Sequence, residues 1–425
     1  MLDIKFIREN PALCKDNMKK KFQDPKVVDD FLKTDEQWRK LRAEIDTLRH
    51  DRNKISEEIN KAKKAGKDVK AIVKKAKDIP NIIKKNEEKQ AKLQKQLLPL
   101  LAKIPNIMHE SVPIGKDDTQ NPEIKKWGKP PKFSFPIKNH VEICESLGIA
   151  DFEASAKSSG NGFYYLEGDL ALLNQALIRF AVDFMQKKGY YYIETPIMLK
   201  NEILAASLDT EEFAKTIYEV KDEGLALIGT AEYSLLARYT GATFLEKDLP
   251  KKVFSYSMCF RKEIGSHGIN EKGLWRTHQF NKVEQVIFCA PEDSYKMYDE
   301  LLKNSEEIMQ TLDLPYRVIE ICSGDLAAWK TKSADVEVWR PTTKEYGEVM
   351  SLSNCTDYQV RNLNIRVDRQ GKRELVHALN NTALATSRIM VAILENFQNK
   401  DGTVTVPKAL VPYMPGKIKI IGKKK

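Results

Sequence analysis

Polar side chains are densest between residues 260 and 284, in two stretches that read FRKEIGSHG (260–268) and WRTHQFNKVE (275–284). This pattern predicts a strand, a long loop and a second strand. Because alternate residues of a strand share a face, His278, Phe280, Lys282 and Glu284 should point the same way. At ~3.3 Å per residue, Phe280 and Glu284 would lie roughly 13 Å apart on that face.

Such a face offers two kinds of contact to a small substrate. The ring of Phe280 could stack on a flat heterocycle, and Glu284 could bind a small polar group at the other end. Arg261, at the end of the first strand, could bind an anion between them. A half-exposed sheet face closed by a salt bridge explains the same pattern without any ligand.

Three further segments combine residue types that could bind a substrate. Gly229-Thr230-Ala231-Glu232 places a hydroxyl two residues from a carboxylate, which can hold an ammonium or simply cap a helix. Glu348-Val349-Met350-Ser351 offers hard oxygen donors for Mg²⁺, although such pairings are common in proteins. Asn380-Asn381-Thr382 precedes an apolar helix, predicted over 383–398, in which Arg388 could equally have a structural role.

The N-terminal part of the chain predicts a long helical hairpin over residues 28–104. Apolar residues recur at alternating spacings of three and four, which is typical of a coiled-coil seam. The outgoing seam comprises Trp38, Leu41, Ile45, Leu48, Ile55, Ile59 and Ala62, and the return seam Val69, Ile72, Ala76, Ile79, Ile83, Asn86, Gln90, Leu93, Leu97, Leu100 and Ile104. About 30 residues per helix give an arm on the order of 45 Å long. The seam continues through Pro80, so we expect a kinked helix there.

The net charge of +10 is concentrated in this hairpin. Residues 1–110 hold 28 Lys and Arg against 18 Asp and Glu, whereas the remaining 315 residues hold 42 of each. Residues 61–92 alone hold 12 Lys and 4 acidic residues. A basic tip on a rigid arm suits contact with a polyanion such as RNA, although a solvated lysine face is the simpler interpretation.

The rest of the chain predicts a connector followed by an α+β domain built on an antiparallel sheet. Proline and glycine are frequent in 105–160, with a short helix near 138–147. Beyond it we expect a helix over 169–188 and strands over 253–260 and 278–288 without regular βαβ spacing. Six scattered cysteines, the lack of a secretory segment and the lack of any run near ~20 apolar residues indicate a cytoplasmic protein with no membrane association.

Taken in order, these segments resemble the seryl-tRNA synthetases of class II. GYYYIETPIML (189–199) is similar to class II motif 1, FRKE…RTHQFNKVE (260–284) to motif 2 and LNNTALATSR (379–388) to motif 3. LIGTAE (227–232), DVEVW (335–339), EVMSLSNCTDYQVR (348–361) and the stretch 104–115 are similar to segments particular to the seryl enzymes. Motif 1 alone would be weak, but TAE, HQFNKVE and EVMSLSNCTDYQ in this order are highly specific.

The resemblance implies a role for each matching residue. The implied serine-binding residues are Thr230, Ala231, Glu232, Arg261, Glu284 and Thr382. The implied ATP-binding residues are Arg261, Lys262, Glu263, Thr277, Phe280, Glu348, Val349, Met350, Ser351 and Arg388, with Glu348 and Ser351 also holding Mg²⁺. Pro196 would lie at a dimer interface. The lysines of the arm that would contact tRNA are Lys61, Lys63, Lys64, Lys67, Lys70, Lys74, Lys75 and Lys77.

The resemblance therefore implies a cytoplasmic homodimer that activates L-serine with ATP and Mg²⁺. It would transfer the seryl group to serine tRNA, with selenocysteine tRNA as a further candidate. The implied domains are a tRNA-binding domain at 1–110, a connector at 111–160 and a class II catalytic domain at 161–425. Two alternatives remain from the sequence: a synthetase-derived ligase that loads an amino acid onto a carrier protein, and a non-catalytic RNA-binding relative.

Overall fold

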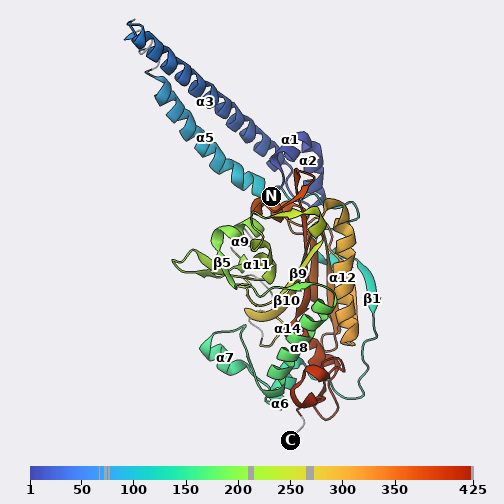
Figure 1. Ribbon diagram of the computed structural model, residues 1–425. Helices are drawn as coiled ribbons and strands as arrows, with labels where there is room; N and C mark the ends of the chain where they lie inside the picture. Colours follow the sequence, from blue (N-terminus) through green and yellow to red (C-terminus); the bar gives the residue numbers. More distant parts are fainter. Residues whose placement is uncertain (67, 71–73, 75–76, 209–214, 265–271, 423–425) are drawn as a thin grey trace. The chain divides into compact units, whose positions relative to one another are not determined.

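The computed structural model describes residues 1–66, 68–70, 74, 77–208, 215–264 and 272–422 (Figure 1). These residues form two compact units, Met1–Pro105 and Asn106–Lys425. Lys67 and Lys75, two of the lysines expected to contact tRNA, lie outside the described residues. Among the described residues, no helix combines the length and the apolar character needed to cross a membrane.

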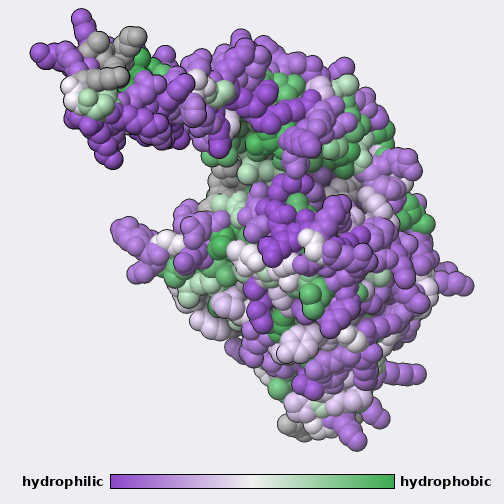
Figure 2. All heavy atoms as spheres, turned by 45° about the horizontal axis from the view of Figure 1, so that its top comes forward, coloured by the Kyte–Doolittle hydropathy of each residue, from purple (hydrophilic) through white to green (hydrophobic). Residues whose placement is uncertain are grey.

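The first unit is entirely helical. Two short helices, α1 (Ile4–Glu9) and α2 (Pro11–Lys20), precede α3 (Lys26–Lys64) and α5 (Ile79–Ala102), which run antiparallel side by side (Figure 1). Ile45 of α3 and Ile83 and Leu97 of α5 are buried, as the seam predicts. The remaining surface of the pair is mostly hydrophilic (Figure 2), because the narrow apolar stripes of the two helices cover each other. The predicted antiparallel arm is confirmed.

The expectation of one kinked return helix is wrong. A turn at Lys77 and Asp78 precedes α5, and Pro80 lies in the first turn of that helix. Proline is well accommodated there, because the backbone N–H groups of the first turn have no partner within the helix. The periodic seam continues across the break, so periodicity alone could not reveal it.

The second unit contains an eight-stranded sheet with the order β1-β11-β12-β13-β16-β10-β9-β4. All neighbouring strands are antiparallel except β4 and β9. In chain order, the strands are β1 (Glu123–Trp127), β4 (Tyr191–Tyr192), β9 (Lys251–Phe260), β10 (Gln279–Cys289), β11 (Tyr316–Glu320), β12 (Lys332–Arg340), β13 (Glu345–Asn354) and β16 (His377–Ala385). The predicted α+β class with an antiparallel sheet is confirmed.

The two faces of the sheet follow from the alternation along β10. Val283 and Ile287 belong to the main core, which also contains residues of α8 (Gly168–Lys187), α12 (Ser294–Thr311) and α14 (Thr386–Asn396). Val286 and Phe288 point to the other face and pack with residues of α11 (Ala231–Ala237) and α13 (Tyr358–Leu363). On that second face, Lys282 and Glu284 precede Val286 on β10, and both of these polar side chains are buried.

Shorter elements complete the second unit. The helices are α6 (His140–Leu147), α7 (Phe152–Ser158) and α9 (Asn201–Ser207). The strands are β2 (Ala150–Asp151), β3 (Tyr165–Leu166), β5 (Met198–Lys200), β6 (Glu219–Val220), β7 (Leu225–Leu227), β8 (Thr243–Leu245), β14 (Arg366–Arg369), β15 (Lys372–Leu375), β17 (Val404–Thr405) and β18 (Ile420–Ile421). α6 begins with a capping box between Asn139 and Glu142, close to the start predicted from the sequence.

The predicted start of the last helix is wrong. Residues 383–385 belong to β16, where Leu384 pairs with Val283 and Ala385 with Lys282, and α14 begins only at Thr386. The segment is apolar on both faces, and such a run does not distinguish a buried strand from a helix. Pairing with β10 decides the outcome in favour of the strand.

Candidate active site

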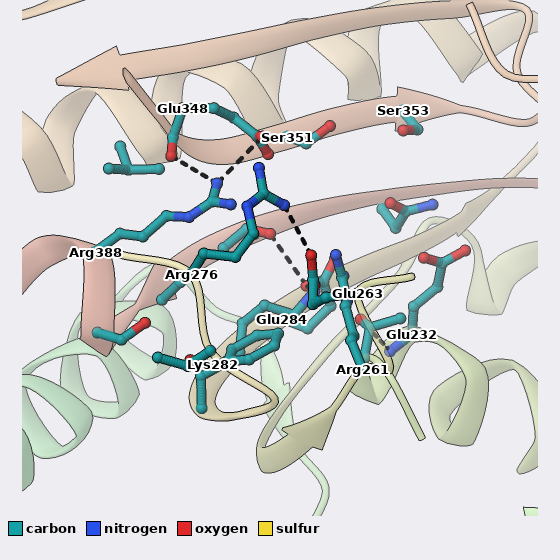
Figure 3. Close-up of a pocket in the computed structure, with 18 of the residues that line it drawn as sticks. Glu232, Arg261, Glu263, Arg276, Lys282, Glu284, Glu348, Ser351, Ser353 and Arg388 are labelled. Atoms are coloured by element: carbon teal, nitrogen blue, oxygen red, sulfur yellow. Dashed lines mark hydrogen bonds and ion pairs between the residues drawn. The ribbon is translucent and has the colours of Figure 1, made fainter. Parts of the chain in front are cut away.

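A cavity of about 210 Å³ lies on the face of the sheet that carries the polar residues of β10. The side chains that line it come from β10, β13, β16, the first turns of α11 and α14, and the loops before β10 and before β12. The lining residues assigned from the sequence are Thr230, Glu232, Arg261, Glu263, Thr277, Phe280, Glu284, Glu348, Val349, Ser351, Thr382 and Arg388. In Figure 3, Arg388 and Glu348 lie together at one side of the cavity and Glu232 lies at the other.

One wall of the cavity is the alternating face of β10. Phe280, Lys282 and Glu284 all line the cavity, as strand alternation predicts. The prediction is wrong for His278, which lies before β10, contacts Tyr218 and does not line the cavity. Lys282 Nζ lies 2.6 Å from Glu284 Oε2, and both side chains are buried. The salt bridge, one of the two interpretations from the sequence, is therefore present, and the same face forms a wall of the cavity. A buried pair of this kind is held in one geometry, because separating the charges in a low-dielectric site is costly.

A bulge on β16 brings Thr382 to Glu284. Val283 pairs with Leu384 and Glu284 pairs with Thr382, so Ala383 has no partner on β10. Thr382 Oγ1 donates a hydrogen bond of 3.4 Å to Glu284 Oε2. This end of the cavity therefore combines a buried carboxylate with a hydroxyl, a pair that can bind a small hydroxyl group.

A second buried carboxylate, Glu232, lies in the first turn of α11. Thr230 caps this helix through a hydrogen bond of 3.2 Å from Glu232 N to Thr230 Oγ1, so the capping interpretation of this segment is also correct. Gln359 Nε2 donates 2.7 Å to Glu232 Oε1. Burial, together with the charge of Glu284, raises the pKa of Glu232 above its ordinary value. A cation bound here would relieve that repulsion.

A second bulge, on β13, aligns Glu348 with Ser351. Residues three apart on a regular strand point to opposite faces. Here Glu348 pairs with Glu337 and Ser351 pairs with Asp335, so Val349 has no partner on β12 and both side chains face the cavity. The sequence gives the oxygen donors but not this extra residue, on which their shared direction depends.

Arg388 closes the opposite end of the cavity from Glu232. Its Nη1 lies 3.1 Å from Glu348 Oε2 and donates 2.7 Å to the Glu348 carbonyl oxygen (Figure 3). Burial alone would raise the pKa of Glu348, but the charge and hydrogen bond of Arg388 lower it. Burial, together with the charge of Glu348, raises the pKa of Asp335 on β12 to about 7.

The donor set at this end suits a hard cation only if a ligand supplies further oxygens. Across the described residues, no group of three or more His, Cys, Asp or Glu side chains is arranged to hold a metal ion. Glu348 and Ser351 provide a carboxylate and a hydroxyl, and Mg²⁺ in nucleotide sites is commonly held by one or two carboxylates plus phosphate oxygens and water. These residues therefore fit a cation that arrives with a phosphate ligand.

Two arginines lie between the two ends. Arg261 Nε donates 3.1 Å to the carbonyl oxygen of Gly229, and its guanidinium lies 5.4 Å from the centre of the Phe280 ring. Arg276 Nη1 donates 2.8 Å to Glu263 Oε2. Arg276 was not assigned from the sequence, although it directly precedes Thr277, which was. Its position in a long loop gave no periodic signal.

Some residues assigned from the sequence do not line the cavity. Ala231 is buried at the start of α11, Met350 belongs to the core, and the backbone N–H of Lys262 donates to the carbonyl oxygen of Thr216. Pro196 is exposed, and its carbonyl oxygen accepts a hydrogen bond from Ser234. The lining residues that the sequence did not assign to a ligand are Tyr233, Trp275, Arg276, Lys282, Trp329, Lys330, Ser353, Asn380, Ala385 and Ser387.

The sheet and the cavity correspond to a known class of enzyme core. Residues 216–397 match the family model of the tRNA synthetase class II core domain (G, H, P, S and T). A prolyl-tRNA synthetase from Giardia lamblia, in complex with prolyl-adenylate, shares this fold with a TM-score of 0.56 at 17% identity over 64% of this chain and 55% of that one. The fold of this unit is that of a class II aminoacyl-tRNA synthetase core.

The N-terminal unit and the full-length relatives define the family more closely. Residues 1–108 match the model of the seryl-tRNA synthetase N-terminal domain. A serine–tRNA ligase of Methanospirillum hungatei is 47% identical over 98% of this chain and 99% of its own length. The structure of a seryl-tRNA synthetase from Pyrococcus horikoshii complexed with ATP has a TM-score of 0.91 at 42% identity, covering 99% of both chains. A cytoplasmic serine–tRNA ligase from Naegleria fowleri in complex with AMP has a TM-score of 0.87 at 34% identity over 99% of this chain and 98% of that one. The chain belongs to the seryl-tRNA synthetase family.

Proposed function

We propose that this protein is a serine–tRNA ligase, which activates L-serine with ATP and transfers the seryl group to the 3′ end of serine tRNA. The observation that carries the proposal is the division of one cavity into two chemically different ends. Buried Glu232, Glu284 and Thr382 form an end that suits a small cationic amino acid with a hydroxyl. Arg388, Glu348 and Ser351 form an end that suits a triphosphate with its cation.

At the first end, the amino acid is recognised by its ammonium and its hydroxyl. Glu232 binds the ammonium, assisted by Thr230. Glu284 and Thr382 bind the hydroxyl. An amino acid that lacks the hydroxyl would leave the buried Glu284 without its partner, and a polar site rejects such an analogue far more strongly than an apolar pocket does.

At the other end, ATP is held by its ring and its phosphates. Phe280 stacks on adenine, with Glu263 and Thr277 along the same side. Arg261 lies at the junction, where it binds both the serine carboxylate and the α-phosphate. Arg388 binds the γ-phosphate. Glu348 and Ser351 would hold Mg²⁺, which supplies charge neutralisation between the phosphates when bound.

The reaction then needs positioning and charge stabilisation rather than a covalent nucleophile. A carboxylate oxygen of serine attacks the α-phosphorus, the bond to the bridging oxygen breaks, and pyrophosphate leaves with seryl-adenylate formed. Arg261 compensates the charge that develops on the α-phosphate, and Arg388 compensates that of the leaving pyrophosphate. The terminal adenosine of the tRNA next attacks the acyl carbon and releases AMP.

The arm would bind the tRNA. The lysines of the tip that the structure describes, Lys61, Lys63, Lys64, Lys70, Lys74 and Lys77, are all exposed. Exposed lysines at the tip of a helical arm can contact the phosphates of an RNA helix, and the family uses such an arm to grip the long variable arm of serine tRNA by shape. We propose that residues 1–110 form the tRNA-binding domain, residues 111–160 the connector and residues 161–425 the catalytic domain.

We also propose that the protein is a cytoplasmic homodimer. The segment around Pro196 follows β4, an edge strand of the main sheet, on which the Tyr191 side chain is 71% exposed. An edge strand with exposed apolar residues is suited to covering by a second copy. The six cysteines are all unpaired and buried, which is compatible with a reducing compartment.

Aminoacylation tests the proposed function. The protein should charge serine tRNA with labelled serine in the presence of ATP and Mg²⁺, and selenocysteine tRNA in the same assay would decide whether it is a second substrate. Charging of a carrier protein instead of tRNA would favour the first alternative, and RNA binding without any ATP turnover would favour the second. The basic arm argues against a ligase that loads a carrier protein, and the intact charged residues of the cavity argue against a non-catalytic relative.

A further inference from the structure

We propose that Trp275 is a positioning residue that fixes the guanidinium of Arg388 at the phosphate end of the cavity. The inference rests on the proposed function, because it concerns how tightly the ATP end is organised. Trp275 lines the cavity, lies in the loop before β10 and stands outside the set of residues that the mechanism uses. Three sets of contacts fix its position: those with Arg388, those of its ring with the sheet, and those of the backbone of the preceding residue.

Trp275 contacts Arg388 through both its ring and its backbone. The Arg388 guanidinium carbon lies 5.5 Å from the centre of the ring, and Arg388 Nε donates a hydrogen bond of 3.3 Å to the Trp275 carbonyl oxygen. The other contacts of this guanidinium are with Glu348. Glu348 is also the carboxylate proposed to hold a cation. When it does so, the contacts with Trp275 still hold Arg388 in the direction of the phosphates.

The edge of the ring is fitted against the strand that carries Glu348. A Cβ atom at Gly347 would lie 2.4 Å from Trp275 Cζ2, which is far inside van der Waals contact. The Arg340 guanidinium carbon lies 4.1 Å from the ring centre. Gly347 and Arg340 therefore confine the ring from β13 and β12, so its direction is determined by the sheet.

The backbone before Trp275 is tied to the helix that carries Arg388. Leu274 N donates 3.1 Å to Nε2 of the buried His140, and His140 Nδ1 lies 3.2 Å from Glu395 Oε1 of α14. Nε2 accepts, so Nδ1 carries the proton and donates to Glu395. Glu395 Oε2 also accepts 2.7 Å from Thr342. This chain of contacts fixes the position of the loop relative to α14. The cation–π contact between Trp275 and Arg388 therefore costs little conformational entropy.

The expected consequence is a selective loss of ATP affinity when the ring is removed. Trp275→Leu should raise the Kd of ATP, measured by calorimetry without serine, roughly three- to tenfold, as expected for a partly desolvated cation–π contact. Trp275→Phe retains an aromatic face and should lose less. The KM for serine in ATP–pyrophosphate exchange should stay within about twofold of the parent, because the serine end does not contact this residue.

The matched control is Trp339→Leu. Trp339 is also partly buried, and its ring meets the ring of Tyr346 edge-on at a centroid distance of 5.1 Å, but it does not line the cavity. This variant should leave the Kd of ATP unchanged. Equal losses in Trp275→Leu and Trp339→Leu would show a merely structural role and overturn the proposal.

A double-mutant cycle tests whether Trp275 acts through Arg388. In an Arg388→Ala background, Trp275→Leu should change the Kd of ATP less than twofold, because the group it positions is gone. Additive losses would mean that Trp275 binds ATP directly. An unchanged Kd of ATP in the single Trp275 variants would mean that Trp275 has no role. Either result contradicts the inference. If Trp275→Leu does not fold, the same cycle with Trp275→Phe decides the question. A parent protein that binds ATP but shows no exchange with serine would overturn the proposed function instead.

Discussion

At the scale of single residues, the serine end of the cavity brings two buried carboxylates, Glu232 and Glu284, close to each other. Lys282 is paired with Glu284, and the charges of Lys282 and Lys330 also act on Glu232. Burial and the charge of Glu284 nevertheless raise the pKa of Glu232, so its charged form is unfavourable until a further cation enters. The ammonium of an amino acid is such a cation, so its binding relieves the repulsion between the two carboxylates.

The first prediction concerns Glu284. Glu284→Gln should lower kcat/KM for serine by roughly 10- to 100-fold, the range for removal of a hydrogen bond to a charged group. The Kd of ATP should not change. Glu284→Ala should abolish serine use. Both variants remove the charged partner of the buried Lys282, so the stability of each must be measured alongside. Exchange kinetics and calorimetry provide the two readouts, and unchanged serine kinetics in Glu284→Gln would remove the role assigned to Glu284.

The second prediction concerns pH and Glu232. Burial and the charge of Glu284 raise the pKa of this carboxyl, so it is protonated, and unable to pair with an ammonium, at a higher pH than an exposed glutamate. The KM for serine should therefore fall as pH rises through this raised pKa, at pH values where the substrate amine stays charged. Glu232→Gln should raise the KM for serine and flatten this dependence. A parental KM that is independent of pH would argue against Glu232 as the ammonium ligand.

Strand alternation predicts the direction of some of the cavity side chains but not of others. Phe280, Lys282 and Glu284 follow a simple two-residue period, so their common face could be predicted. Trp275 and Arg276 lie in an irregular loop, where no period exists, and their places depend on contacts with distant segments. Lys262 and Met350 were assigned through their neighbours in a motif, but their side chains do not line the cavity.

At the scale of elements, two bulges organise the cavity. Each adds one residue to a strand, Ala383 on β16 and Val349 on β13, and each thereby turns a pair of side chains to a common face. Nothing in a single sequence marks a bulge that lacks glycine, because the partner strand determines it. The same dependence on pairing explains why residues 383–385 were predicted as helix and are found in β16.

The third prediction concerns the arm. Replacing Lys61, Lys63 and Lys64 with glutamine should weaken tRNA binding and reduce the slope of log K against log salt by about 0.7 to 0.9 for each phosphate that a lysine no longer neutralises. The three arginine substitutions retain the charge and serve as the control. Filter binding at several salt concentrations gives both values. A salt slope equal to that of the parent would show that these lysines do not bind the phosphates.

The arm also shows which features of a helix can be predicted. Its seam residues were evident from their spacing, and Ile45, Ile83 and Leu97 are indeed buried. The break before α5 was not evident from the sequence, because Pro80 is compatible both with a kink and with a helix start. The apolar period also continues across the break.

At the scale of the whole molecule, the net positive charge and the candidate active site belong to different units. The net charge of +10 lies within residues 1–110, whereas the cavity is built entirely from the unit Asn106–Lys425. This separation predicts that RNA binding and amino acid activation can be abolished independently.

The fourth prediction follows from that separation. Deleting residues 30–103 should leave serine-dependent ATP–pyrophosphate exchange within about threefold of the parent, because no residue of the cavity is removed. Charging of serine tRNA by the same variant should fall by at least about 100-fold, because most of the lysines that bind phosphate are removed. Charging that survives the deletion would mean that the tRNA is gripped elsewhere.

Selection of serine by the buried Glu232, Glu284 and Thr382 underlies the whole proposed activity. It is tested by ATP–pyrophosphate exchange measured with serine, alanine, threonine and cysteine under identical conditions. We predict the highest kcat/KM with serine and a decrease of roughly 10⁴-fold or more with alanine, the range for a site that hydrogen-bonds a substrate hydroxyl. Faster exchange with any other amino acid, or none with serine, would show that these residues do not select serine.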